Sequence, residues 1–270
     1  MEVLGVAKMK DVAELAGVDK GTVSRVIKGD PRISDLTAQR VWEAVHKLGY
    51  RPDRLASGLA AGRWDLCGLV IQDQFGWWVG PFLDGFARGL SAKGNSVLVL
   101  GGGWGRGPCD ELVGRKVDGV LWMGDVPSSS VGLSDLPFPV LRWGDVEGDC
   151  GASIGFHQDL LVEALHEAVG PFRYVGGRWS PFSFLEGRQD PDGRALVWDG
   201  TVRWDPVPPG VSVVLGPFPG MPCPRVWTVP LNPREVGLVC GRALGRLIKA
   251  PRARMSIRLE VRPSAPEPLG

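Results

Sequence analysis

The 270-residue sequence has few of the features that mark secreted, membrane or metal-binding proteins. Its five cysteines are scattered, at positions 67, 109, 150, 223 and 240. They form no C-x-x-C pair, which argues against a disulfide framework or a zinc site and for a reducing compartment. No apolar run approaches the roughly 18 residues of a membrane-spanning helix, and no charged-then-apolar leader opens the chain. We therefore expect a cytoplasmic protein that is neither exported nor embedded in a membrane.

Motifs for enzymatic chemistry are missing as well. The glycine-rich stretch 101–107 would need a glycine at position 106 to match G-x-G-x-x-G, but Arg106 stands there, and no G-K-[ST] follows. The histidines, His46, His157 and His166, have no metal-ligand spacing with one another or with a cysteine. No local motif indicates a Ser-His-Asp arrangement. We expect a protein that is not an enzyme and that binds no cofactor or metal ion.

The net charge is only +1, so the chain is not a polycation that coats nucleic acid. The charges are unevenly placed, because residues 1–63 hold 11 Lys and Arg against 8 Asp and Glu, and the remainder holds 20 against 22. This modest positive bias near the start suits a short, specific contact with DNA.

Two short helices are predicted at residues 10–28. Val12, Leu15 and Ala16 repeat at helical spacing and predict the buried face of the first helix, and Gly17 lets that helix stop abruptly. Asp19 is a good N-cap for the second helix. Neither helix is stable alone, because free helices below about 12 residues are marginal in water.

The second and third helices complete a helix-turn-helix pattern. Val23, Val26 and Ile27 form the apolar side of the second helix, and a third helix over 35–48, with Ser34 placed to cap it, provides the packing partner. A second helix with small polar and basic side chains fits the major groove of DNA, which is about 12 Å wide. The alternative is an ordinary three-helix bundle whose charges are only solvated.

Residues 9–63 resemble the DNA-binding headpiece and hinge of the lactose-repressor (LacI/GalR) family. The chain reads D-V-A-E-L-A-G-V-D-K-G-T-V-S-R-V-I-K over 11–28 and Y-R-P-D-R-L-A-S-G-L over 50–59. The family pattern is approximately D-V-A-x-x-A-G-V-S-x-x-T-V-S-R-V-L-N, then Y-x-P-N-x-x-A-x-x-L. Agreement over about fifty residues is far beyond a chance match to a short motif.

The resemblance implies roles for individual residues. Lys20 and Gly21 fall where the family places its main base-reading pair, and Leu59 falls on the hinge leucine that enters the minor groove. The full set of implied DNA contacts is Lys20, Gly21, Thr22, Ser24, Arg25, Lys28, Ser34, Tyr50, Arg54, Ala56 and Leu59.

Three positions depart from the family pattern. Asp19 replaces a serine, Lys28 replaces an asparagine, and Gly21 lacks a reading side chain. We therefore expect sequence discrimination to depend on Lys20 and on deformation of the DNA by the hinge. The hinge residues 53–60 are a poor free helix, and we expect them to fold only on the operator.

Beyond residue 63, apolar stretches typical of buried parallel strands alternate with helices. Strands are expected near 66–71, 96–100, 118–123, 140–143, 151–156, 172–175, 195–198, 211–215, 226–229 and 256–262, and helices near 80–93, 109–116, 158–169 and after 232. This alternation predicts parallel, doubly wound sheets with right-handed crossovers. The 39 glycines and 23 prolines indicate tight connections rather than disorder.

This order is similar to the sensor domain of the same family, which shares the two-lobed fold of periplasmic sugar-binding proteins. The expected fold is a three-helix helix-turn-helix headpiece and hinge followed by a two-lobed, periplasmic-binding-protein-like α/β domain. The expected boundaries are 7–52 for the headpiece, 53–63 for the hinge, 64–263 for the sensor and dimerisation domain and 264–270 for the tail. Within the sensor domain we expect lobe 1 at 66–145 and 224–250, and lobe 2 at 146–220 and 253–262.

The residues that anchor a sugar in that family are not retained. Phe184 stands where the resemblance places an anchoring arginine, and residues 216–218 replace an acidic pair. A sugar needs convergent polar groups, so sensing of an ordinary sugar is in doubt. Aromatic residues remain near the expected crevice and are the candidate effector contacts: Phe75, Trp77, Trp78, Trp104, Trp122, Trp143, Phe184 and Trp198. They either form platforms for a flat or sugar-like ligand or fill a cleft that no longer opens, and we favour the second interpretation.

We expect a sequence-specific transcriptional regulator, most simply a repressor, that binds a palindromic double-stranded DNA operator as a homodimer. A carbohydrate-type effector is one means of control. A Trp-filled cleft that needs no effector, or that a protein partner controls, is the alternative. A small-molecule-binding protein with a vestigial headpiece is a further hypothesis from another functional class.

Overall fold

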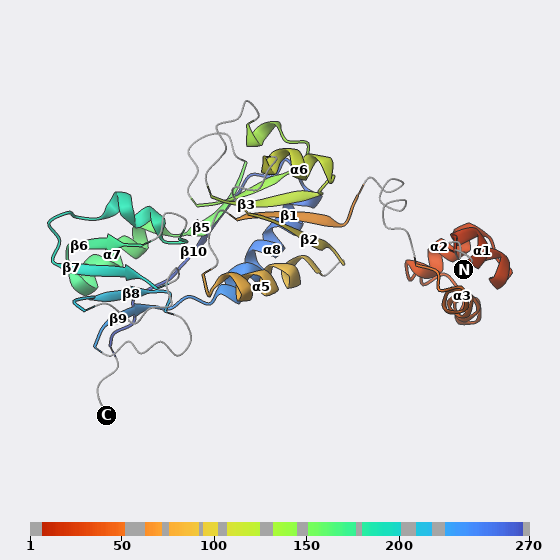
Figure 1. The fold of residues 1–270 in the computed structure, drawn as a ribbon, viewed down its shortest axis with the longest axis horizontal. Coiled ribbons are helices and arrows are strands. Elements are labelled where there is room, and N and C mark those ends of the chain that lie inside the picture. Colours follow the sequence, from red (N-terminus) through yellow and green to blue (C-terminus); the bar gives the residue numbers. More distant parts are fainter. Residues whose placement is uncertain are drawn as a thin grey trace, which may run out of the picture. The chain divides into compact units, whose positions relative to one another are not determined.

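The computed structural model describes residues 7–51, 63–71, 76–91, 94–101, 107–124, 132–144, 151–176, 180–200, 209–217 and 225–266. They divide into two compact units, one ending at Trp64 and the other beginning at Asp65 (Figure 1). None of the described helices is long and apolar enough to span a lipid bilayer.

The first unit is a bundle of three helices, α1 (Met9–Ala16), α2 (Lys20–Ile27) and α3 (Asp35–Leu48). Gly17 ends α1 with a φ of +66°, a left-handed conformation that glycine adopts without steric cost. Buried side chains from all three helices, together with Tyr50 just after α3, form one core: Val12, Ala13, Ala16, Val23, Val26, Val41, Ala44, Val45 and Tyr50. Because helices this short are marginal alone, the shared core stabilises all of them.

One predicted core position in this bundle is wrong. Leu15 is 45% exposed, whereas Ala13 is 5% exposed. The buried side chains of α1 are Val12, Ala13 and Ala16, which form a narrow stripe toward the other two helices. At 3.6 residues per turn, residue 15 lies beside that stripe rather than on it.

The second unit begins with a six-stranded sheet in which every adjacent pair of strands is parallel. The strand order is β10-β5-β4-β3-β1-β2. The strands are β1 (Leu66–Ile71), β2 (Ser96–Gly101), β3 (Gly119–Met123), β4 (Val140–Trp143), β5 (Ala152–Phe156) and β10 (Met255–Leu259).

Helices cover both faces of this sheet (Figure 1). Leu69 and Leu121 point toward α5 (Val79–Ser91) and α8 (Pro233–Lys249). The alternate residues Val70 and Trp122 pack with α6 (Pro108–Gly114) and the 3₁₀ turn η1 (Leu133–Asp135) on the other face. The continuous apolar sequences of these strands follow from this two-sided burial.

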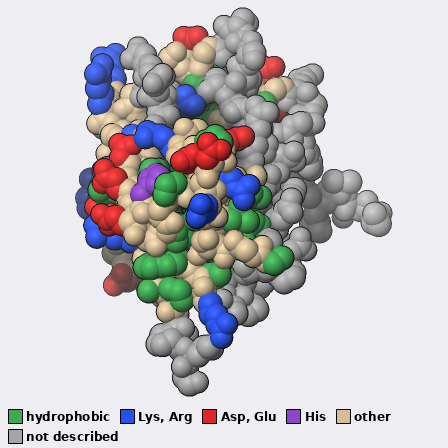
Figure 2. Space-filling view, turned by 90° about the vertical axis from the view of Figure 1, so that its left-hand side faces the viewer, with side chains coloured by type: hydrophobic (Ala, Val, Ile, Leu, Met, Phe, Trp, Pro, Cys, Tyr) green, Lys and Arg blue, Asp and Glu red, His purple; other side chains and the backbone are tan. Residues whose placement is uncertain are grey.

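A second, four-stranded parallel sheet has the order β6-β7-β8-β9. Its elements are β6 (Phe172–Val175), β7 (Ala195–Asp199), β8 (Val213–Leu215) and β9 (Trp227–Val229), with α7 (Gln158–Val169) and the 3₁₀ turn η2 (Ser183–Arg188) packed against it. Figure 2 looks onto this end of the unit and shows acidic and basic side chains interspersed over its described part. Such a mixed surface provides no extended positive field for a polyanion.

Three strands pair in a different sheet from the one we expected. The segments 151–156 and 253–262 were predicted in lobe 2, but β5 and β10 pair in the six-stranded sheet. Conversely, β9 was predicted in lobe 1 and pairs with β8 in the second sheet. The reason is that β5 and β10 pass from one core to the other: Ile154 lies in the first core, whereas Phe156 and Leu259 pack in the second. A strand's own pattern does not reveal which neighbour it will choose.

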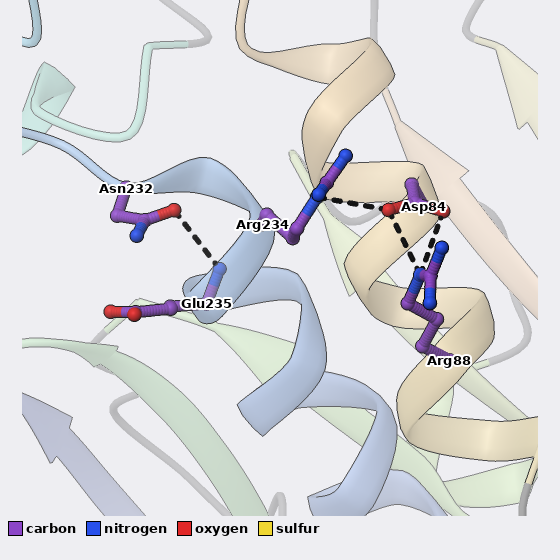
Figure 3. Close-up of polar contacts among 5 residues, drawn as sticks. All are labelled: Asp84, Arg88, Asn232, Arg234 and Glu235. Carbon is purple, nitrogen blue, oxygen red and sulfur yellow. Dashed lines mark hydrogen bonds and ion pairs between the residues drawn. The ribbon is translucent and has the colours of Figure 1, made fainter.

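Helices α5 and α8 pack with their backbones in contact. Glycines occupy the contact at Gly85 and Gly89 in α5 and at Gly237 and Gly241 in α8, and a Cβ at Gly89 would lie only 2.5 Å from the carbonyl oxygen of Leu238. Figure 3 shows the exposed rim of this contact, where the Asp84 carboxylate accepts from Arg88 Nε at 3.0 Å and pairs with Arg234 Nε at 2.9 Å. Ion pairs this exposed contribute little, so the close backbone approach accounts for the tight packing.

Candidate nucleic-acid interface

Helix α2 presents its polar side chains outward from the bundle. Val23 and Val26 are 0% and 5% exposed and hold the helix on the core. Lys20, Arg25 and Lys28 are exposed, and the predicted contacts Gly21, Thr22 and Ser24 are exposed or half-buried. The structure therefore brings the predicted α2 contacts together on the accessible side of one short helix.

The N-terminus of α2 is capped by a carboxylate, as predicted. Asp19 Oδ1 accepts from the Thr22 backbone N–H at 2.9 Å, and Asp19 Oδ2 accepts from the Thr22 hydroxyl at 2.6 Å. These hydrogen bonds from Thr22 lower the pKa of Asp19 below its ordinary value, so the cap carries a full negative charge at neutral pH. A phosphate approaching this helix end meets that charge, and the Thr22 hydroxyl keeps only its acceptor capacity free.

Gly21 leaves space that the Arg25 side chain borders. A Cβ at position 21 would lie 2.8 Å from Asp19 Oδ1 and 3.5 Å from Arg25 Nη2. The missing side chain therefore lets the capping carboxylate and the Arg25 guanidinium sit close to the same stretch of backbone. A side chain at position 21 would need the Asp19 carboxylate to shift, whereas its contact with Arg25 would be an ordinary van der Waals contact.

A second charged group follows α2 and was not found from the sequence. Asp30 accepts from Arg32 Nε at 2.9 Å and from Arg32 Nη2 at 2.7 Å, and the Arg32 backbone N–H donates to the same carboxylate at 3.1 Å. The pair lowers the pKa of Asp30, with a further contribution from the charge of Arg25, and raises the pKa of Arg32. The bidentate pair lies in the turn between α2 and α3, where the Arg32 side chain is 83% exposed.

The remaining headpiece predictions divide into two groups. Ser34 caps α3, because its Oγ accepts from the Thr37 backbone N–H at 3.4 Å and lies 2.9 Å from Thr37 Oγ1. Tyr50 is only 8% exposed and packs in the bundle core, while its N–H donates to Val45 O at 3.0 Å. The hinge contacts Arg54, Ala56 and Leu59 lie outside the described residues.

The predicted effector contacts do not form one cluster. Trp122 packs with α6 on one face of the first sheet, and Trp198 packs with Val211 and Val214 in the second lobe. Phe184 is half-buried against the second core. Phe75 and Trp104 lie outside the described residues.

Among the predicted aromatics that the structure describes, Trp77, Trp78 and Trp143 lie where the lobes meet. Trp77 Nε1 donates to the Gly216 carbonyl at 3.2 Å. Trp143 packs edge-to-face on Phe156, with ring centroids 5.4 Å apart. Trp78 is 2% exposed, and its Nε1 has no hydrogen-bond partner among the described residues.

A small apolar cavity remains between these side chains. Its volume is about 10 Å³, and its lining is Trp78, Phe82, Met123, Trp143, Phe156, Pro181, Leu231, Pro233 and Val236. Sites for small ligands typically have about 300–1,000 Å³ and a few convergent polar groups. The described part of the junction is therefore filled by protein side chains.

A buried polar pair in the second lobe was also missed from the sequence. The Tyr174 hydroxyl donates to Asp199 Oδ2 at 2.8 Å, and Asp199 is 0% exposed. Burial and the Asp199 charge raise the pKa of Tyr174, so its hydroxyl stays protonated. Residues 174 and 199 are far apart in sequence, and no local motif signals their contact. Among the described residues, no group of three His, Cys, Asp or Glu side chains is placed to hold a metal ion.

Together, the fold and this surface define a class of protein: a helix-turn-helix headpiece joined to a two-lobed parallel α/β domain. Residues 8–53 match the profile of the family described as "Bacterial regulatory proteins, lacI family". This match covers the three-helix headpiece and agrees with the resemblance seen in the sequence.

Curated relatives match over the headpiece and part of the second domain. The regulator PtxS of Pseudomonas plecoglossicida is 48% identical over 66 residues, covering 24% of this chain and 19% of the relative. The maltose regulon regulatory protein MalI of Escherichia coli K12 is 36% identical over 123 residues, covering 44% and 36%. Catabolite control protein A of Staphylococcus xylosus is 29% identical over 189 residues, covering 63% and 55%. The chain thus spans from about a fifth to about half the length of these relatives.

Solved structures share the whole fold. The lac repressor dimer bound to operator and an anti-inducer matches with a TM-score of 0.74 and 18% identity, covering 97% of this chain and 98% of that one. A complex of the regulator CelR with cellobiose matches with a TM-score of 0.53 and 19% identity, covering 97% and 99%. The predicted fold class, a helical headpiece followed by a two-lobed α/β domain, is therefore confirmed.

Proposed function

We propose that this protein is a sequence-specific DNA-binding transcriptional regulator that acts as a repressor. The observation that carries the proposal is the arrangement of α2, in which buried Val23 and Val26 leave Lys20, Arg25 and Lys28 exposed on the outer surface. A helix of this size enters the major groove, where cations and short polar side chains reach base edges and phosphates. Such a regulator works in the cytoplasm, at the nucleoid.

We further propose that two copies bind an approximately palindromic operator. A two-fold dimer presents its two α2 helices about 34–36 Å apart, one turn of DNA. The lac repressor structure, in which a dimer is bound to operator, supports this arrangement because the chains share one fold. The hinge leucines, Leu59 of each copy, then enter the minor groove at the operator centre.

For control of the regulator, the packing between the lobes favours a cleft that is filled by aromatic side chains. Trp77 spans the junction to Gly216, and Trp78 and Trp143 line a cavity of about 10 Å³. On this proposal no ordinary sugar is the effector, and the protein acts without one or responds to a protein partner. A carbohydrate-type effector is the second candidate, and the cellobiose complex of CelR, which shares the fold, favours it.

Selection of binding sites from random duplexes tests the DNA-binding proposal. We expect a defined palindrome to be recovered by the full chain and to be lost with Arg25→Ala or Leu59→Ala. Arg40→Ala is the matched control, because Arg40 is an exposed cation on α3 that is not among the predicted contacts. Recovery of no preferred site would overturn the proposal and favour a ligand-binding protein with a vestigial headpiece.

A sugar panel tests the control mechanism. Tryptophan fluorescence and operator affinity are followed together while mono- and disaccharides, including cellobiose, are added. We expect neither signal to change. A sugar that shifts both signals would instead establish the carbohydrate-type effector.

A further inference from the structure

A hollow of about 780 Å³ opens at the amino ends of β4, β5 and β10. Val140 and Ala152 line it where β4 and β5 begin, and residues 251–254 line it just before β10. Open α/β sheets bind ligands at the carboxyl ends of their strands. Because this sheet is entirely parallel, the hollow lies at the opposite edge, where β1 also begins after the connection from the headpiece.

The floor of the hollow is apolar, and its wall contains a 3₁₀ turn and two prolines. Leu133, Leu136 and Phe138 line it and are each less than 10% exposed. The turn η1 is closed by the Gly132 N–H, which donates to Asp135 Oδ2 at 3.0 Å. Pro137 and Pro139 follow at the same wall, and their rings fix the backbone angle φ. The volume is within the range of small-molecule sites.

The charged side chains in the described lining of the hollow are both positive. Its described lining includes two charged side chains, Arg252 and Arg254, and neither makes an ion pair with another described residue. The Asp135 carboxylate, which accepts from the Gly132 N–H, is not part of the described lining. A guanidinium group binds carboxylate and phosphate through two parallel hydrogen bonds.

Arg252 and Arg254 are not needed to stabilise the C-terminus of α8. Cations often stabilise the C-terminus of a helix, and α8 ends directly before residues 251–254. However, Arg246 and Lys249 already lie in the last turn of α8. Arg252 and Arg254 therefore add positive charge beside an apolar hollow that the helix itself does not require.

We propose that this hollow binds a small organic anion, with its carboxylate or phosphate group between Arg252 and Arg254 and its hydrocarbon body on Leu133, Leu136 and Phe138. The site is separate from the junction between the lobes and from α2. Binding is therefore measured on the full chain without DNA, and its outcome is independent of the operator experiment.

Calorimetric titration with matched probes tests the proposal. Benzoate and phenyl phosphate carry both parts of the ligand, acetate and inorganic phosphate carry the charged group alone, and benzyl alcohol carries the ring alone. We expect one site per chain for benzoate or phenyl phosphate, with at least about tenfold weaker binding of the single-part probes. The tighter of the two full probes identifies the charged group.

Variants assign the binding to this hollow. The Arg252→Ala/Arg254→Ala double variant should weaken binding by about tenfold or more, and Ser134→Trp should block it by filling the hollow while both cations remain. Arg246→Ala, an exposed cation of α8 outside the lining, should bind like the unaltered protein. Circular dichroism checks that each variant is folded. Absence of saturable binding by either full probe, or unchanged binding by the folded double variant, would overturn the proposal.

Discussion

Helices α5 and α8 lie so close that one methyl group between them should measurably destabilise the second unit. A Cβ at Gly241 would lie 3.0 Å from the Cα of Gly89 and closer still to the carbonyl oxygen of Phe86. Both of these are backbone atoms, so no side-chain rotation relieves the overlap. In Gly241→Ala the two helices must therefore move apart and lose part of their packing.

The same helix contains a matched control. At Gly245, one turn further along α8, a Cβ would meet no atom within 4 Å. Replacing glycine by alanine inside a helix normally stabilises by about 1 kcal/mol, and we expect this full gain for Gly245→Ala. Overpacking costs about 1–3 kcal/mol, and backbone neighbours place Gly241 at the upper end. Subtracting the helix gain, we expect Gly241→Ala to lower the free energy of unfolding by about 2 kcal/mol.

Scanning calorimetry of the full chain separates the two substitutions. For a domain of about 200 residues, 1 kcal/mol corresponds to about 2–4 °C in Tm. The Tm of the second unit should therefore rise by about 2–4 °C in Gly245→Ala and fall by about 4–8 °C in Gly241→Ala. Equal stabilisation by both substitutions would refute the close approach of the two backbones.

Three further predictions concern the headpiece. Asp19→Asn keeps an N-cap but removes a negative charge from the helix end that we predict to contact DNA. Operator affinity at low salt should therefore rise by about two- to threefold in a filter-binding assay, whereas Asp19→Glu should give no gain. Folding lowers the pKa of Asp19 and of Asp30 below 3.8, so both stabilise the headpiece above that pH and lose this effect as the pH falls through their folded pKa values. Hydrogen exchange of α2 amides, corrected for intrinsic rates, should therefore lose protection between pH 5 and pH 3, and less so in Asp19→Asn/Asp30→Asn. A dimer that neutralises about eight phosphates should show a slope near −7 in log affinity against log salt, and a slope near zero would contradict phosphate contact.

The sequence predicted the features that depend on neighbouring residues. Asp19, Ser34 and Asn232 cap their helices as expected, the last by accepting from the Glu235 N–H at 3.3 Å. Capping is decided within about four residues, so local spacing contains the information. For the same reason the predicted strands and helices of the second unit agree with the structure to within a few residues.

The errors and omissions depend on contacts between distant residues. Whether β9 pairs in one sheet or the other, or whether Trp122 faces a crevice or the α6 side, depends on the three-dimensional order of strands. The Tyr174–Asp199 pair likewise joins two strands. The exposure of Leu15 was also mispredicted from spacing. An apolar residue beside a buried stripe of a helix has nearly the same sequence spacing as one within the stripe.

The candidate DNA-binding surface was predicted mainly because its residue types match a family pattern. The structure adds which of these side chains are accessible: Lys20, Arg25 and Lys28 are exposed, whereas Tyr50 is buried. Their contacts with DNA stay predictions. The Asp30–Arg32 pair could have been suspected from its spacing in a turn, but ion pairs two residues apart are too common in sequence to single out.

Strands β5 and β10 connect the two lobes of the second unit through a paired two-stranded ribbon. They are hydrogen-bonded to each other along their whole length, begin among the side chains of one core and end among those of the other. Any rotation of one lobe against the other must therefore twist this two-stranded ribbon and strain its backbone hydrogen bonds.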